Sequence, residues 1–108
     1  MSSPDVLLVI SNFPDRDTAL SVARELIERR LVACVNVQSP CESVYRWEGK
    51  VEAATEVPVL MKTTRDRYAA LETALRHAHP YDLPEIIAVP VVAGSSGYMD
   101  WVNAETSA

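Results

Sequence analysis

The sequence feature that most constrains the fold is a long alternating pattern on both sides of one turn signal. Apolar and polar residues alternate from Ala33 to Trp47 and again from Val51 to Thr63, with Glu48-Gly49-Lys50 between the two runs. A period of two is typical of β-strands, and a glycine in such a turn can take a positive φ. We therefore expect a long β-hairpin. Pro40 predicts a bend or bulge in its first arm, and Pro58, which has no amide hydrogen, predicts an edge or a bulge in its second arm.

Two apolar runs and three helical patterns flank this hairpin. Short runs rich in Val and Ile are typical of buried strands, and apolar residues that recur every three to four positions are typical of amphipathic helices. Asp15 or Asp17 can cap the first helix. The predicted strands are residues 5–11, 33–47, 51–63 and 85–92, and the predicted helices are residues 16–30, the segment between Thr64 and Pro80, and residues 98–104.

The order of these elements, β-α-β-β-α-β with a short helix at the end, predicts an α+β fold. It is the order of the split βαβ, or ferredoxin-like, sandwich, in which two helices cover one face of an antiparallel sheet. A chain of 108 residues is long enough for one domain with its own core. We expect a single domain over residues 1–108, with residues 1–4 and 106–108 as flexible tails.

Composition excludes several classes of partner. The formal charge is −5, and the ten Lys and Arg residues are scattered along the chain, whereas binding to nucleic acid needs clustered cations. The first apolar run, Val6 to Ile10, is too short for a signal peptide or a membrane span. We therefore expect a cytoplasmic protein with no nucleic-acid or membrane partner.

The predicted hairpin is too long for the predicted helices. A helix of about 15 residues spans roughly 22 Å at ~1.5 Å per residue, whereas strands of about 14 residues reach roughly 45 Å at ~3.3 Å per residue. The far half of the hairpin carries Tyr45, Trp47 and Val51, and an exposed edge of this kind invites pairing with other chains. We expect copies of the chain to cover it in a closed ring. The alternative is that the hairpin curls back over the open face of its own sheet.

The stretch HAHPYDLPEI, residues 77–86, holds both histidines of the chain. His77 belongs to the last helical turn, where a cationic side chain interacts favourably with the helix dipole. Residues two apart on a helix point to nearly opposite sides, so His77 and His79 are not expected to share a metal. His79 lies on the connection into the last strand. It is the one candidate metal ligand, although a firm site needs three or four ligands.

No catalytic motif accompanies this stretch. Lys62, Tyr81, Asp82 and Glu85 have the chemistry for acid and base catalysis. However, the sequence contains no GxSxG, P-loop or GxGxxG motif. A solvated loop that stops a helix is the favoured interpretation, and we predict no enzymatic activity. Cys34 and Cys41 have neither CxxC nor zinc-ribbon spacing, which favours two reduced thiols.

Five segments, spread over roughly residues 5–105, resemble the CutA1 family of divalent-cation tolerance proteins. These segments are LVACVNV, YRWEGKVE, LMKTT, HPYDLPEI and GYMDWVNAET. The resemblance implies a ferredoxin-like subunit that assembles into a tight homotrimer, similar in architecture to the PII signalling proteins. It also implies a role in tolerance or response to divalent metals, with copper or another divalent cation as a ligand. It implies no enzymatic reaction.

The resemblance also implies candidate sites. In some bacterial members of the family, copper is assigned to a cysteine at the end of the first strand and to two adjacent histidines before the PY dipeptide. Ser11 and Ala78 occupy two of these positions here, and only His79 matches. Cys34 matches a further family cysteine. The likeness to PII proteins gives the alternative function, small-molecule sensing in a pocket between subunits lined by Lys62, Tyr81, Glu85 and Trp47.

Overall fold

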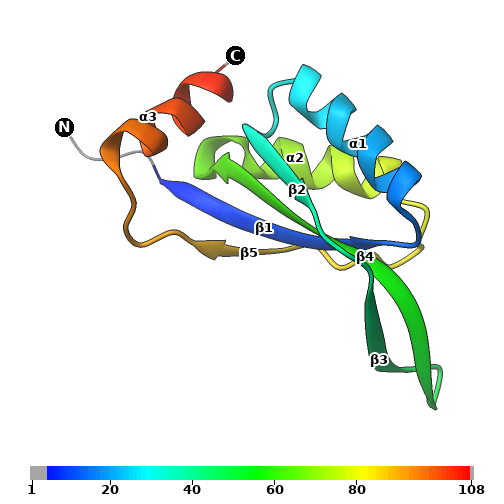
Figure 1. The fold of residues 1–108 in the computed structure, drawn as a ribbon. Coiled ribbons are helices and arrows are strands. Elements are labelled where there is room, and N and C mark those ends of the chain that lie inside the picture. The colour runs from blue at the N-terminus through cyan, green and yellow to red at the C-terminus, as the bar shows by residue number, and fades with distance from the viewer. Residues whose placement is uncertain (1–4, 108) are drawn as a thin grey trace.

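The computed structural model describes residues 5–107, so residues 1–4 and 108, which belong to the predicted tails, lie outside the described part. One five-stranded sheet has two helices on one face, and a hairpin extends beyond the helices (Figure 1). The strands are β1 (Val6–Phe13), β2 (Cys34–Val37), β3 (Cys41–Trp47), β4 (Lys50–Thr64) and β5 (Ile87–Pro90). The helices are α1 (Arg16–Glu28), α2 (Arg65–Ala78) and α3 (Ser96–Glu105).

The sheet is antiparallel, as predicted for a ferredoxin-like sandwich. Its order is β2-β4-β1-β5, and β3 pairs with the free end of β4. All of these pairs are antiparallel. The predicted α+β class, with a long central hairpin and a short C-terminal helix, is therefore confirmed.

The core lies between the sheet and the two long helices. Strand periodicity places Val9 of β1 opposite Met61 of β4, and both side chains are almost fully buried. Leu26 of α1 and Leu71 of α2 cover them from the helix side. Side chains of the opposite parity lie on the other face of the sheet, where the described residues leave Ile87 and Val89 of β5 exposed. α1 and α2 therefore cover one face of the sheet, and on the other, open face α3 packs near Val6 through Met99 and Val102.

A bulge separates the two halves of the first hairpin arm. β2 ends at the pair Val37–Val59 and β3 begins at the pair Cys41–Glu56. Three residues lie between these pairs on the first arm and two on β4, so the first arm carries one extra residue. The predicted bend near Pro40 is thus confirmed as a β-bulge.

Pro58 lies opposite this bulge. Its carbonyl oxygen accepts a hydrogen bond from the backbone N–H of Gln38, at 2.9 Å. The nitrogen and the carbonyl of a residue in an antiparallel strand point to the same side, so the missing N–H of Pro58 faces the break in the ladder. The bulge thus places the residue that cannot donate a backbone hydrogen bond at the break in the ladder.

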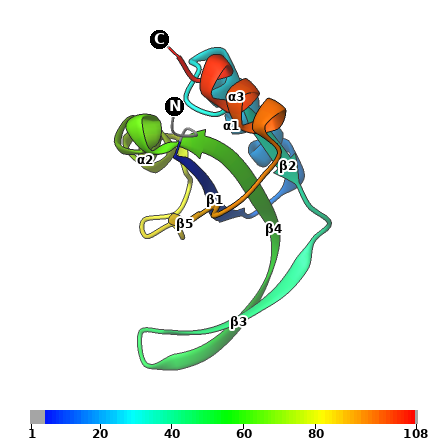
Figure 2. The same cartoon turned by 90° about the vertical axis from the view of Figure 1, so that its left-hand side faces the viewer.

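The hairpin ends in a two-residue turn and extends away from the helices. Glu48 and Gly49 have φ of 51° and 81°, the signs of a type I′ turn, and Trp47 pairs with Lys50 across it. Figure 2 shows β3 and the start of β4 as an arm well separated from α1 and α2. Its large exposed apolar residues are Val44, Tyr45, Trp47 and Val51. The predicted length mismatch between hairpin and helices is therefore present.

Several predicted boundaries differ from those observed. β1 continues to Phe13, because Asn12 and Phe13 keep their pairing with β4. The last strand covers only residues 87–90, and it ends at Pro90, which cannot donate to the ladder. α1 ends two residues earlier than predicted, and Arg30 turns the chain with a φ of 57°.

The predicted tail from residue 106 is wrong for Thr106. Its side chain is buried, and its hydroxyl donates a 2.8 Å hydrogen bond to the carbonyl oxygen of Val102. Thr106 therefore ends α3 as a packed residue. Among residues 5–107, no helix is long and apolar enough to cross a membrane.

Candidate functional site

The imidazole of His79 is a structural link between α2 and β1. His79 follows directly after α2, and only 7% of it is exposed. The backbone N–H of Tyr81 donates to His79 Nδ1 at 3.1 Å, so Nδ1 carries no hydrogen. Nε2 lies 2.7 Å from the carbonyl oxygen of Asn12 and therefore acts as the donor. Both ring nitrogens are thus engaged.

The position of β5 explains why Asn12 needs this partner. β5 pairs with β1 only from Leu7 to Ile10, so the Asn12 carbonyl lies beyond the end of the ladder. A buried carbonyl without a donor is costly, and His79 supplies one. The imidazole also stacks on the ring of Phe13, with centroids 4.4 Å apart. Burial lowers the pKa of His79 from its ordinary value, so the neutral ring is the favoured form.

Tyr81 and Glu85 belong to the same hydrogen-bonded chain. The side-chain amide of Asn12 donates to Glu85 Oε1 at 2.8 Å. Burial, and then the nearby Glu56 carboxylate, raise the pKa of Tyr81 to about 12, so its hydroxyl stays protonated. The chain runs from Tyr81 through His79 and Asn12 to Glu85. Asn12 was not predicted as a site residue, because the predicted first strand ended at residue 11, although Asn12 continues the alternation of β1.

The structure does not bring Lys62 or Trp47 to this group within one chain. Lys62 Nζ donates to Asn36 Oδ1 and lies 3.9 Å from Cys34 Sγ, on the side of the sheet where β2 pairs. Trp47 lies at the tip of the hairpin arm. A pocket that combines Lys62, Tyr81, Glu85 and Trp47 therefore stays a prediction about contacts between subunits.

The predicted metal ligands do not form a preassembled site. Within residues 5–107, no three His, Cys, Asp or Glu side chains are grouped so as to hold a metal ion. Ser11 is fully buried on the helix side of β1, and its hydroxyl has no hydrogen-bond partner. Metal binding by His79 would require the release of one of its two hydrogen bonds. His77 lies apart, in a polar pocket with Arg76 and Asp82.

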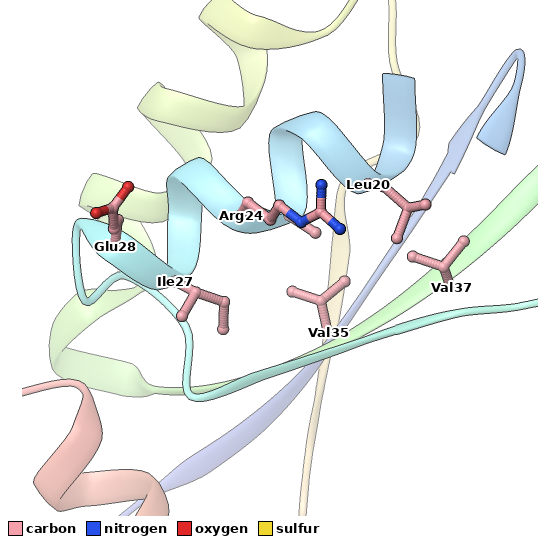
Figure 3. A pocket seen from close by; sticks show the side chains of 7 residues that line it. Leu20, Arg24, Ile27, Glu28, Val35 and Val37 are labelled. Atoms are coloured by element: carbon pink, nitrogen blue, oxygen red, sulfur yellow. The ribbon is translucent and has the colours of Figure 1, made fainter. Parts of the chain in front are cut away.

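An apolar groove lies beside the outer strand of the sheet (Figure 3). Leu20 and Ile27 of α1 form one wall, and Val35 and Val37 of β2 form the other, around a volume of about 490 Å³. The groove exists because β2 is a short edge strand, so no further strand lies beneath the overhanging side of α1. None of the predicted site residues lines it.

Comparisons with known proteins agree on one family. The family described as CutA1 divalent ion tolerance protein matches residues 7–105. The divalent-cation tolerance protein CutA of Pectobacterium atrosepticum is 41% identical over 93% of this chain and 91% of its own length. The protein of the same name from Thermus thermophilus is 37% identical over 92% of this chain and 96% of its own length. The crystal structure of CutA from Xylella fastidiosa superposes with a TM-score of 0.93 at 42% identity, covering 95% of this chain and 99% of that one.

The buried imidazole predicts a loss of stability in mild acid. Because the pKa of His79 is lowered in the folded state from 6.5, the unfolded state binds this proton more readily. The stability that neutral His79 contributes is therefore present above pH 6.5 and is lost as pH falls toward the folded-state pKa. We expect the urea concentration at the unfolding midpoint to decrease as the pH is lowered from about 7.5 to about 5.5. His79→Gln should flatten this dependence and His77→Gln should retain it, and equal profiles for the two variants would contradict the assignment.

The unpartnered hydroxyl of Ser11 predicts a stabilising substitution. A buried hydroxyl without a partner costs about 1 kcal/mol or more, so Ser11→Ala should raise the free energy of unfolding by about 1 kcal/mol. Thr63 is the matched control, because its buried hydroxyl donates a 2.7 Å hydrogen bond to the Leu31 carbonyl. Thr63→Val should lower the free energy by about 1 kcal/mol. Urea titrations that give both changes the same sign would overturn this account.

Proposed function

The chain belongs to the CutA1 family of divalent ion tolerance proteins, and from this membership we propose that it acts as a homotrimer that binds copper or another divalent cation weakly. The family match, which extends from β1 to the end of α3, is the observation that carries this proposal. We propose a non-enzymatic role, since the family and its relatives are described by tolerance to divalent ions and not by a reaction.

Three exposed apolar surfaces support assembly. The hairpin arm presents Tyr45 and Trp47 at 42% and 45% exposure. The open sheet face leaves Ile87 half exposed. The groove between α1 and β2 is apolar and lies at a sheet edge with unpaired backbone groups. A second and a third copy of the chain would cover these surfaces and close the ring, which removes the free edges.

The geometry of His79 supports weak rather than tight metal binding. A metal at Nδ1 would displace the Tyr81 N–H, and a metal at Nε2 would displace the Asn12 carbonyl. Each displacement costs about 1 kcal/mol or more, because a buried backbone group then loses its partner. One imidazole is also too few ligands for a firm site, so further ligands would come from neighbouring copies or from water.

Small-molecule sensing is the second candidate function. The observation that favours it is the polar cluster around Lys62, which lies on the open sheet face and contains an ammonium group with no carboxylate partner among residues 5–107. A ligand bound there would contact residues that neither the core nor the His79 link uses.

Assembly is tested by light scattering after size exclusion. We expect a mass near three times 11.9 kDa for the wild-type chain. Trp47→Glu should shift the mass toward the monomer, because burying a charge in place of an interfacial tryptophan costs about 2 kcal/mol or more. Ala70→Glu, on an exposed position of α2, is the matched control and should remain trimeric. A wild-type monomer at micromolar concentration would remove the trimer from the proposal.

Direct metal binding is tested by calorimetric titration with Cu²⁺. We expect weak binding that His79→Ala reduces by about tenfold or more, since the substitution removes the single candidate imidazole ligand. His77→Ala is the matched control, because His77 is the other histidine of the chain. This variant should bind Cu²⁺ as the wild type does. Equal Cu²⁺ binding by the wild type and by both variants would show that His79 is not a Cu²⁺ ligand. The family role would then not involve this side chain.

A further inference from the structure

Lys62 is a cation without an anionic partner, although the chain is rich in carboxylates. The chain has 15 Asp and Glu residues, and the three ion pairs among residues 5–107 involve only arginines. Lys62 is partly buried, and its ammonium contacts two neutral groups, Asn36 Oδ1 and Cys34 Sγ. A partly buried charge is costly when it is not paired.

The side chains around Lys62 have more hydrogen-bond donors than acceptors. The ammonium has three donors, the Asn36 amide has two, and the thiol of Cys34 has one. The hydroxyl of Tyr98, from α3, is a further donor near this thiol; burial and then the nearby Cys34 raise the pKa of Tyr98. The acceptors are fewer: Asn36 Oδ1, which the Lys62 ammonium already uses, the Tyr98 hydroxyl oxygen and the weakly accepting Cys34 sulfur. A surplus of donors around one positive charge is the chemistry of an anion site.

Strand register places an apolar surface directly beside this cluster. Cys34 pairs with Lys62, Lys62 pairs with Leu8, and Leu8 pairs with Val89, so these four residues form one row across the open face. The next row on the same face is Asn36, Leu60, Ile10 and Ile87. Cys34, Asn36 and Lys62 therefore form a polar cluster on the β2 side of this face, and Leu60 together with the side chains of β1 and β5 forms its apolar part.

We propose that Lys62, Asn36, Cys34 and Tyr98 form a binding site for a carboxylate attached to an apolar body. The carboxylate accepts hydrogen bonds from the Lys62 ammonium and the Tyr98 hydroxyl. The apolar body lies on Leu8 and Val89, and Val89 is 42% exposed in the single chain.

A carboxylate fits this cluster better than a phosphate. The cluster contains one cation, which balances the single charge of a carboxylate, whereas a phosphate monoester carries close to two charges at neutral pH. Phosphate sites usually add arginine or several backbone N–H groups. The neighbouring leucine and valine side chains also favour an organic acid over an inorganic anion.

Two sources can supply such a carboxylate. One is a small organic acid, which rests on sensing as the second candidate function and requires Leu8 and Val89 to stay accessible when other copies cover the rest of the open face. The other is an Asp or Glu side chain of a second copy of this chain, which rests on the homotrimer. Both sources place the same chemical group on Lys62, and the experiment separates them.

The test combines ligand binding with thiol protection. Phenylacetate is the probe, and neutral phenylacetamide is its matched control. If a small acid is the source, phenylacetate should slow the alkylation of Cys34 by iodoacetamide several-fold, as measured by peptide mass spectrometry. Cys41, which is exposed on β3, is the internal control and should not respond. Phenylacetamide should protect neither thiol.

Variants of the two lysines of the chain then assign the effect to Lys62. Lys62→Met should weaken phenylacetate binding about tenfold or more, since a hydrogen bond to a charged group is lost. Lys62→Arg should retain binding, and Lys50→Met, at the hairpin tip, should leave it unchanged. Circular dichroism of Lys62→Met confirms that the fold is intact before these values are compared.

Light scattering of the ligand-free proteins tests the second source. If a neighbouring copy supplies the carboxylate, Lys62→Met should shift the mass toward the monomer, Lys50→Met should not, and phenylacetate should leave Cys34 alkylation unchanged. If Lys62→Met and Lys50→Met show the same phenylacetate binding and the same mass, the proposal is overturned. If the wild-type chain is a monomer and still binds phenylacetate through Lys62, the proposed trimer is wrong. The proposed carboxylate site is then still supported.

Discussion

The backbone pairing along β4 is the interaction on which the rest of the structure depends. This strand is 15 residues long and pairs with β1 on one side and with β2 and then β3 on the other. Because side chains alternate, one parity of β4 supplies Val57, Val59 and Met61 to the core. The opposite parity supplies Lys62 to the open face. A single strand therefore determines the core, the hairpin arm and the polar cluster.

The His79 link illustrates a conflict between packing and ligand binding. An imidazole that donates to the Asn12 carbonyl and accepts from the Tyr81 N–H completes the backbone hydrogen bonding where β5 stops short. The same two nitrogens are the atoms that a metal would need. The structural use favours a neutral, buried ring, and the ligand use favours a ring with one free lone pair. One side chain can serve both uses only through exchange between two local conformations.

Much of the fold could be predicted from the sequence, because its signals are local. Alternation around Glu48-Gly49 predicts the hairpin, and Pro40 and Pro58 predict the bulge. The contacts of the candidate site could not be predicted in the same way. Whether Lys62 meets Cys34 or His79 depends on register between strands far apart in sequence, and a slip of one residue moves a side chain to the other face. Asn12 was missed for the same reason, because its importance comes from where β5 ends.

The bulge opposite Pro58 divides the hairpin into two independently registered parts. In the inner part, β2 pairs with β4 beside the core. In the outer arm, β3 pairs with β4 and the two strands have no other strand partner in the described residues. A change in the length of the outer arm would be absorbed at the break, and the inward-facing residues near the helices would keep their positions. The reach of the arm can therefore change without a change in the geometry of the central sheet. In an assembly, such an arm allows subunit spacing to diverge without redesign of the core.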